Sequence, residues 1–244
     1  MPKEIIVLPL ITVVLTFLPT VVLLSFFYLR DKNREPRKVL SLTLLYGGLT
    51  FIPVIFVELF LAELGILANA SSVVFNLYDN LVNVALPEEF FKLLVILLYA
   101  SKSSAFDEPM DGIVYGAAAA LGFATIENIF YVLDGGLGTA ITRAILSVPS
   151  HTFWGVILGY SVAQVKFRHK SKWLIPLALL ITSTLHGLFN FFLISIEGAS
   201  SYASSLGGWA ILGLFHVLFI TFAFEVVWIV RKVNKLRREQ SSKM

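Results

Sequence analysis

Residues 77–100 are LYDNLVNVALPEEFFKLLVILLYA, a run long and apolar enough to cross a lipid bilayer, and Glu88, Glu89 and Lys92 lie in its middle. An ionisable side chain near the bilayer centre costs about 2.5–3.5 kcal/mol, so such residues usually face the bundle interior, pair with one another and mark a functional site. Three more ionisable residues lie in later apolar stretches: Glu127, His151 and His186. The sequence therefore predicts a buried polar site inside a membrane protein.

The composition of the 244 residues supports this class, because 57% are hydrophobic and only 14% are charged. The net charge is +3, but the basic residues fall in short runs between apolar stretches, as topogenic charges do. We therefore expect the lipid bilayer as a partner and no nucleic acid. Cysteine is absent, which excludes disulfides, thiolate metal ligands and a thiol nucleophile.

Apolar windows of about 20 residues predict an all-α, polytopic bundle of about seven transmembrane helices. Their limits are 5–29, 39–62, 77–100, 112–133, 140–164, 173–196 and 209–230. Of the 19 Lys and Arg residues, 16 follow the first, third, fifth and seventh windows, so the positive-inside rule places the N-terminus outside and the C-terminus in the cytoplasm. We expect outer loops at 63–76, 134–139 and 197–208.

We expect one transmembrane domain over residues 1–244, in a prokaryotic cell membrane, with a catalytic core at 77–196 and a basic cytoplasmic tail at 231–244. The pattern does not define an oligomeric state. It also contains no internal repeat of the kind found in many transporters.

The orientation also gives the depth of each ionisable residue below the outer membrane surface, because a helix rises 1.5 Å per residue. Glu88, Glu127, His151 and His186 each lie 6–11 positions from the outer end of their window, which is roughly 9–17 Å below the outer surface. Four such residues from four consecutive helices at one depth indicate a single inward-facing cluster.

Local spacing adds detail to this cluster. Glu88 and Lys92 are four residues apart and share a helix face, so we expect the ammonium to neutralise one carboxylate and leave its neighbour free for chemistry. Pro87 would break or kink the helix and place both carboxylates near a helix N-terminus. His186 and Asn190 are also four residues apart.

Other residues have structural explanations. Small residues in window 112–133 predict close helix packing: Gly112, Gly116, Gly122 and the alanines 117–120. Ionisable residues near the ends of windows are expected to snorkel to the interface: Glu58, Glu63, Arg143 and Glu225.

Carboxylates beside imidazoles in a watery membrane cavity suit hydrolysis in either of two arrangements. In one, Glu127, His151 and His186 bind a divalent metal such as zinc, and Glu88 or Glu89 is the general base. In the other no metal is present, a glutamate activates water directly, and a histidine with Asn190 stabilises the oxyanion. The sequence leaves both open, together with the choice between Glu88 and Glu89.

Other hydrolase designs do not fit, since the chain has no HExxH motif, no GxSxG motif and no pair of mid-span aspartates. Glu88–Lys92 resembles the EExxK motif of the PrsW family of intramembrane proteases, and 123–127 with Asn128 resembles its FxxxE motif. His151 and His186 resemble the histidines of its two later helices. The order is also similar to the wider superfamily of CAAX prenyl proteases and the Aph subunit of gamma-secretase, with Glu127 where those proteases have histidine.

The resemblance implies an intramembrane protease that cleaves a membrane-anchored protein, for PrsW a transmembrane anti-sigma factor. Three alternatives stay open. His151 and His186 would be axial ligands in a b-type haem protein, and the carboxylates would relay protons in an ion-coupled transporter. A noncatalytic, Aph-like scaffold is the third.

Overall fold

The computed structural model describes residues 4–197 and 199–242, and every regular element in these ranges is helical. The elements are α1 Glu4–Arg30, α2 Arg37–Leu49, α3 Phe51–Glu63, α4 Ser72–Tyr78, the π-helical turn η1 Asp79–Ala85, α5 Leu86–Leu98, the 3-10 turn η2 Ala100–Lys102, α6 Pro109–Thr142, the π-helical turn η3 Arg143–Ser147, α7 Val148–Arg168, α8 Leu174–Glu197 and α9 Ala199–Ser241. Within the described part of the chain, four helical stretches are long and apolar enough to cross a membrane: Ile11–Arg30, Arg37–Glu63, Pro109–Arg168 and Leu174–Leu193. The protein is therefore an all-α, multi-pass membrane protein.

The longest of these stretches folds back on itself at Gly136, where φ is 66°. Glycine reaches this conformation without the strain that a Cβ would cause. Beyond the turn α7 runs antiparallel to α6, since Gly112 faces Gly159 and Gly116 faces Gly155. A Cβ at Gly112 would lie only 2.4 Å from the Gly159 carbonyl oxygen, so the close packing predicted for this part of α6 is confirmed.

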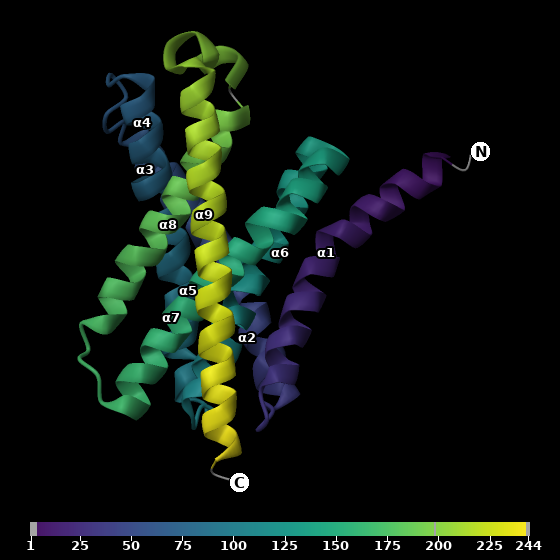
Figure 1. Ribbon diagram of the computed structural model, residues 1–244, viewed down its shortest axis with the longest axis vertical. Helices are drawn as coiled ribbons and strands as arrows, with labels where there is room; N and C mark the ends of the chain where they lie inside the picture. The colour runs from purple at the N-terminus through teal and green to yellow at the C-terminus, as the bar shows by residue number, and fades with distance from the viewer. Residues whose placement is uncertain (1–3, 198, 243–244) are drawn as a thin grey trace.

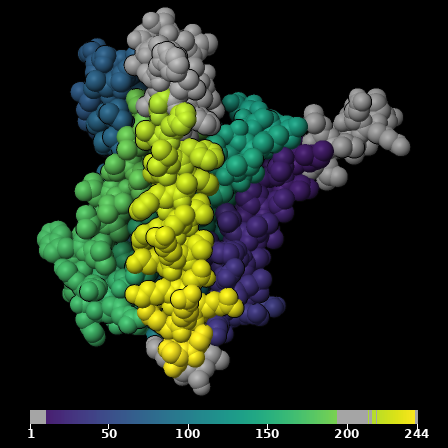
Figure 2. All heavy atoms as spheres, in the orientation of Figure 1, coloured from purple at the N-terminus to yellow at the C-terminus, as the bar shows by residue number. Residues whose placement is uncertain are grey.

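Helix α6 forms the centre of the bundle, and its first half is almost completely buried. Helix α2 also approaches it closely, because a Cβ at Gly122 would meet the Leu44 carbonyl oxygen at 1.9 Å. Figure 1 shows α6 behind α9, with α1 on one side and α7 and α8 on the other. In Figure 2 the atoms of α9 run as a column down the face toward the viewer, so α9 covers this side of the bundle.

Two segment boundaries predicted from the sequence differ from those in the structure. The window 77–100 falls on α4, η1 and α5, and its helix begins earlier, at Ser72. The expected outer loop at 197–208 is wrong, because α9 already begins at Ala199 and continues to Ser241. Residues 199–208 are rich in alanine and serine, which are compatible with a helix, so this loop-like composition does not prevent α9 from beginning at Ala199.

The segments that the charge pattern placed on one side lie together at one end of the bundle. They are the loop after α1, the residues after α5, the end of α7 and the end of α9. Three contacts join them: Lys32 with Ser241, Lys166 with the Ser101 carbonyl, and Arg168 with Glu239.

Candidate active site

Two helices of the site begin directly after a π-helical turn and contain a proline in their first turn. Turn η1 precedes Pro87 of α5, and turn η3 precedes Pro149 of α7. Proline has no N–H and its ring crowds the preceding turn, so a turn widened by one residue accommodates it without ending the helix. The sequence predicted a break or kink at Pro87. The helix does not break there, because the backbone stays helical from Ser72 to Leu98, and the irregularity is a π-helical turn.

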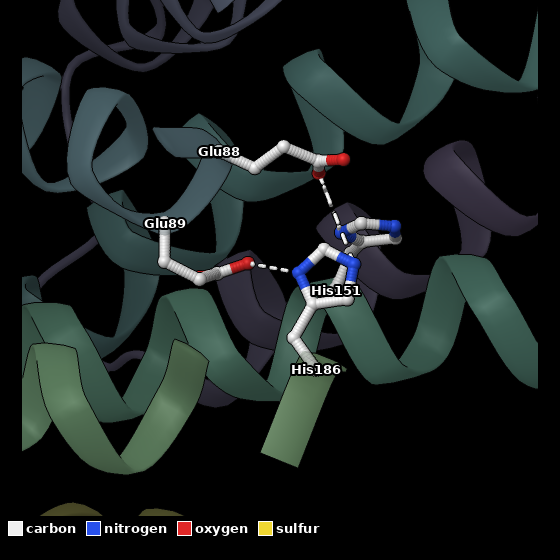
Figure 3. Close-up of side chains that lie close together, drawn as sticks. All are labelled: Glu88, Glu89, His151 and His186. Atoms are coloured by element: carbon white, nitrogen blue, oxygen red, sulfur yellow. Dashed lines mark hydrogen bonds and ion pairs between the residues drawn. The ribbon is translucent and has the colours of Figure 1, made fainter. Parts of the chain in front are cut away.

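The two turns bring carboxylates and an imidazole to helix N-termini. Glu88 and Glu89 lie in the first turn of α5, His151 lies in the first turn of α7, and His186 comes from the middle of α8. All four are at least 96% buried. Figure 3 shows their side chains converging on one point.

Lys92 lies at the centre of this cluster and is fully buried. Its Nζ is 2.8 Å from Glu89 Oε1, 3.2 Å from Glu88 Oε2 and 2.8 Å from His151 Nδ1. The ammonium also lies 4.2 Å from the centroid of the Phe123 ring, a cation–π contact. Lys92 therefore contacts both carboxylates, whereas the spacing alone predicted that it would neutralise one of them.

His186 is fixed on both nitrogens. Its Nδ1 is 3.0 Å from Glu89 Oε1, and its Nε2 is 3.1 Å from Asn190 Nδ2. A carboxylate only accepts, so Nδ1 carries the proton and Nε2 accepts a hydrogen bond from the Asn190 amide. The Trp154 ring stacks on the imidazole at 4.3 Å, and Trp154 Nε1 donates to Glu225 Oε1 at 3.1 Å. Stacking and hydrogen bonds together set the plane and the tautomer of His186.

His151 has the opposite tautomer. Because Lys92 donates to Nδ1, the proton is on Nε2, which lies 3.0 Å from Glu127 Oε2. Arg143 holds the same carboxylate at 2.7 Å and donates from its Nε to Asn128 Oδ1 at 3.0 Å. Glu127 and Arg143 thus orient His151 from the side away from Lys92.

The two imidazoles contact each other edge to face, with ring centroids 4.8 Å apart. A porphyrin needs its full thickness between two axial histidines, and this contact leaves no space for one. The arrangement contradicts the haem alternative.

The donor atoms of Glu88, Glu89, His151 and His186 all lie within 4.8 Å of one another. Two carboxylates and two imidazoles supply the oxygen and nitrogen ligands that catalytic zinc uses. Glu89 Oε2 is buried and has no hydrogen-bond partner among the described residues, so the set retains a free donor atom and fits a divalent metal. Glu127, which the sequence grouped with the two histidines as a ligand, lies instead on the far nitrogen of His151.

A polar cleft of about 480 Å³ leads to this cluster from one end of the bundle. The residues that line it include Glu127, Tyr131, Asp134, Arg143, His151 and Asn190. Gly135 also lines the cleft, which therefore opens beside the turn at Gly136. Water and a substrate segment can approach His151 and Asn190 by this route.

Carboxylates and imidazoles gathered inside an apolar bundle, with a polar route to them, are what an enzyme needs to hydrolyse bonds within a membrane. Sequence comparison narrows this class: residues 35–229 match the model of the family described as "PrsW family intramembrane metalloprotease". The chain belongs to this family and is an intramembrane protease.

Individual relatives agree. The chain is 39% identical to "Protease PrsW" of Geobacillus kaustophilus over 181 residues, which cover 73% of this chain and 78% of the relative. It is 36% identical to "Protease PrsW" of Oceanobacillus iheyensis, over 80% and 86% of the two chains, and 34% identical to that of Bacillus subtilis, over 73% and 81%. No solved structure gives a significant match. These relatives favour a protease over the transporter and the noncatalytic scaffold.

All seven residues that the sequence singled out lie in one connected network: Glu88, Glu89, Lys92, Glu127, His151, His186 and Asn190. Sequence reasoning assigned Arg143 and Glu225 to snorkelling and did not consider Trp154, although all three are buried in or beside the site. For Arg143, its place in an outer segment otherwise almost free of positive charge is the signal that could have found it.

Proposed function

We propose that the protein hydrolyses a membrane-anchored protein close to the outer face of the membrane, with Glu88 as the general base. The observation that carries this proposal is the buried set of Glu88, Glu89, His151 and His186, whose donor atoms lie within 4.8 Å of one another beside a polar cleft. The substrate segment would meet this set at the end of the cleft that His151 and Asn190 line.

The proposed topology has seven passes, with the N-terminus outside and the C-terminus in the cytoplasm. Two observations support it. The segments rich in Lys and Arg gather at one end of the bundle, and the cleft opens at the turn at Gly136, within the predicted outer loop 134–139. The proposed catalytic core is 77–196, since all seven site residues fall within it, and 231–244 is the proposed cytoplasmic tail.

The distances distinguish the two glutamates. Glu89 is held by Lys92 at 2.8 Å and by His186 at 3.0 Å, whereas Glu88 is 3.2 Å from Lys92 and 3.9 Å from either histidine. A base must release its existing contacts to take a proton from water. Glu88 is the freer carboxylate, so we assign the proton transfer to Glu88 and the positioning of Lys92 and His186 to Glu89.

In the proposed reaction the water oxygen bonds to the scissile carbonyl carbon, and Glu88 takes the proton that the water loses. The carbon–nitrogen bond then breaks, and Glu88 returns the proton to the leaving amine. Asn190 lines the cleft and one N–H of its amide donates to His186, so the other N–H of the same NH2 group would stabilise the oxyanion. Trp154 and the apolar walls behind His186 limit the water that reaches it.

A divalent metal, with zinc as the candidate, would be held by members of the set Glu88, Glu89, His151 and His186. When bound, such a metal polarises the carbonyl and lowers the pKa of water. Glu127 then acts as the carboxylate that orients a histidine ligand, an arrangement common at protein metal sites.

The substrate class follows from the size of the cleft. About 480 Å³ is the volume of a small-ligand pocket, so a folded domain cannot enter, and an extended segment next to a membrane anchor can. The resemblance of Glu88–Lys92 and 123–127 to the PrsW motifs makes a single-span anti-sigma factor the substrate to test first.

The test is cleavage of an epitope-tagged, single-span anti-sigma factor by the purified protein in liposomes, with the product ends mapped by mass spectrometry. We expect Glu88→Gln, Glu89→Gln and His186→Ala each to reduce turnover at least about 100-fold. Glu63→Gln removes an exposed carboxylate at the end of α3 and should leave turnover unchanged. Undiminished turnover in all three site variants would falsify the proposal, and metal analysis of the active protein tests zinc.

A further inference from the structure

A second buried cluster of acids lies at the other end of the bundle. Asp31 and Glu35 belong to the loop between α1 and α2, Glu108 caps the N-terminus of α6, and Asp111 is in the first turn of α6. All four are at least 91% buried. The active-site cleft opens at the opposite end of α6, so this cluster is separate from the candidate active site.

The charge of these carboxylates is not balanced by basic residues. Among the residues that the structure describes, no Lys or Arg forms an ion pair with any of them. Their side-chain partners are neutral: the Tyr115 hydroxyl donates to Glu35, and Gln240 donates to Asp31 at 2.6 Å and to Glu108 at 2.5 Å. Burying several carboxylates without a counter-charge is strongly unfavourable, so the arrangement favours a positively charged ligand.

One oxygen of each aspartate is used by neighbouring donors. Asp31 Oδ1 accepts from the Asn33 N–H at 3.0 Å, and Asp111 Oδ2 accepts the N–H groups of Asp107 and Glu108 at 2.6 and 2.7 Å. These bonds fix the orientation of both carboxylates in the absence of any ligand.

The other oxygens have no donor. Asp31 Oδ2 and Asp111 Oδ1 are buried without a hydrogen-bond partner in the described part of the chain, although Asp31 and Asp111 are only 2% and 1% exposed. The Asp111 carboxyl contacts that of Glu35, and one oxygen from each of Asp31, Glu35 and Asp111 lies within 4.8 Å of the other two. Carboxyl oxygens held this close together need either a shared proton or a cation between them.

We propose that Asp31, Glu35 and Asp111 bind a divalent cation of the hard, oxygen-preferring kind, Mg²⁺ or Ca²⁺. All three ligands are carboxylates and no histidine belongs to the group, in contrast to the mixed nitrogen and oxygen donors at the candidate active site. Oxygen-only sites favour Mg²⁺ or Ca²⁺, and sites with imidazole favour transition metals. The two clusters are therefore expected to bind different metals.

The cation would link three segments that are far apart in the sequence. Gln240 of α9 contacts Asp31 and Glu108 and accepts a hydrogen bond from the Lys32 N–H at 3.2 Å. A cation on Asp31 and Asp111 thus holds together the loop after α1, the start of α6 and the end of α9. In the proposed topology this site faces the cytoplasm.

The experiment uses the full-length protein in detergent, stripped of metal, with Mg²⁺ or Ca²⁺ added separately while thermal unfolding is followed. We expect a saturable rise of several degrees in the unfolding temperature with at least one of the two cations. Terbium luminescence excited through tyrosine provides a direct probe of binding, because the Tyr115 hydroxyl bonds to Glu35.

Two variants remove one ligand each and retain an oxygen for the existing hydrogen bonds: Asp31→Asn and Asp111→Asn. Each should weaken the cation midpoint at least tenfold. Asp107→Asn removes an exposed acid from the same loop as Glu108 and should not change the midpoint, and Glu89→Gln should not change it either, because it alters only the intramembrane cluster.

The absence of a shift with both cations at millimolar concentration overturns the proposal, since shared protons then suffice to hold the cluster. A shift that persists unchanged in Asp31→Asn and Asp111→Asn, or that disappears in Glu89→Gln, also overturns it. If one variant does not fold, the midpoint of the other decides.

Discussion

Replacement of Lys92 by methionine tests the electrostatic account of the active site. The ammonium is 2.8 Å from Glu89 and 3.2 Å from Glu88, and all three side chains are at least 95% buried. At an effective dielectric constant of about 20, unit charges at these distances attract by about 6 and about 5 kcal/mol, most of which the desolvation of the three groups offsets. Lys92→Met keeps the apolar stem and leaves both carboxylates uncompensated, so we expect the free energy of unfolding to fall by about 3–5 kcal/mol.

The assay is reversible unfolding in mixed micelles with a chelator present, for Lys92→Met, Glu89→Gln and the double variant. Because Glu89 lies closer to Lys92 than Glu88 does, the interaction energy from this cycle should exceed that from the matching Glu88→Gln cycle. Lys170→Met removes an exposed lysine and should change stability by less than about 0.5 kcal/mol.

Two results would refute this reasoning. One is a loss below about 1 kcal/mol for Lys92→Met without metal, and the other is an equal loss in the Glu89→Gln background. The same unfolding measurement in the presence of zinc tests the metal site, because a cation bound between the carboxylates replaces the missing positive charge. The destabilisation by Lys92→Met should therefore shrink in zinc, and an unchanged loss would show that zinc does not use this donor set.

Three further predictions concern Arg143, two glycines and Glu35. Arg143→Gln should lower turnover about 10–100-fold with little change in KM, because Arg143 orients Glu127 rather than binding substrate; unchanged turnover would contradict this role. Gly116→Ala should destabilise the protein, since a Cβ there would lie 2.3 Å from the Gly155 carbonyl oxygen, whereas Gly138→Ala, with open space around it, should be neutral or stabilising in denaturant unfolding. Burial raises the pKa of Glu35 to about 7, so the folded state binds more protons than the unfolded state; in chelator, the unfolding temperature should fall as pH rises from about 5 to about 8, and a rise would contradict it.

The residues of the candidate site could be picked out from the sequence because each is anomalous in lipid. Glu88, His151 and His186 stand in apolar runs where a charge or an imidazole needs a reason, and helix geometry was enough to place them at one depth. The irregular helix before Pro87 followed from proline chemistry, although the form it takes, a π-helical turn, did not. The small residues of α6, among them Gly112 and Gly116, also predicted its close packing.

The partners of each residue required the fold. Arg143 stands near the end of its window, where snorkelling is a sufficient explanation, and only the η3 turn shows that it points inward to Glu127. The residues that could bind a metal also differ from the set Glu127, His151 and His186 that the sequence suggested. Glu127 contacts Nε2 of His151, on the side of the ring away from Lys92, and the sequence does not show how the ring is oriented. The sequence analysis did not single out the acids at 31, 35 and 111, since their proximity depends on contacts between distant parts of the chain.

The charge balance of the candidate active site favours the binding of a cation. Both imidazoles are neutral, because His151 accepts a hydrogen bond from Lys92 and His186 accepts one from Asn190. With all three carboxylates ionised, the buried network would contain Glu88, Glu89 and Glu127 against the cations of Lys92 and Arg143, an excess of one negative charge. An apolar bundle disfavours this excess, and either a proton on Glu88 or a metal cation beside Glu88 and Glu89 removes it. Glu127 has its own cation in Arg143 at 2.7 Å, so the uncompensated charge rests on the α5 pair, and a metal is expected to bind there rather than on the far side of His151.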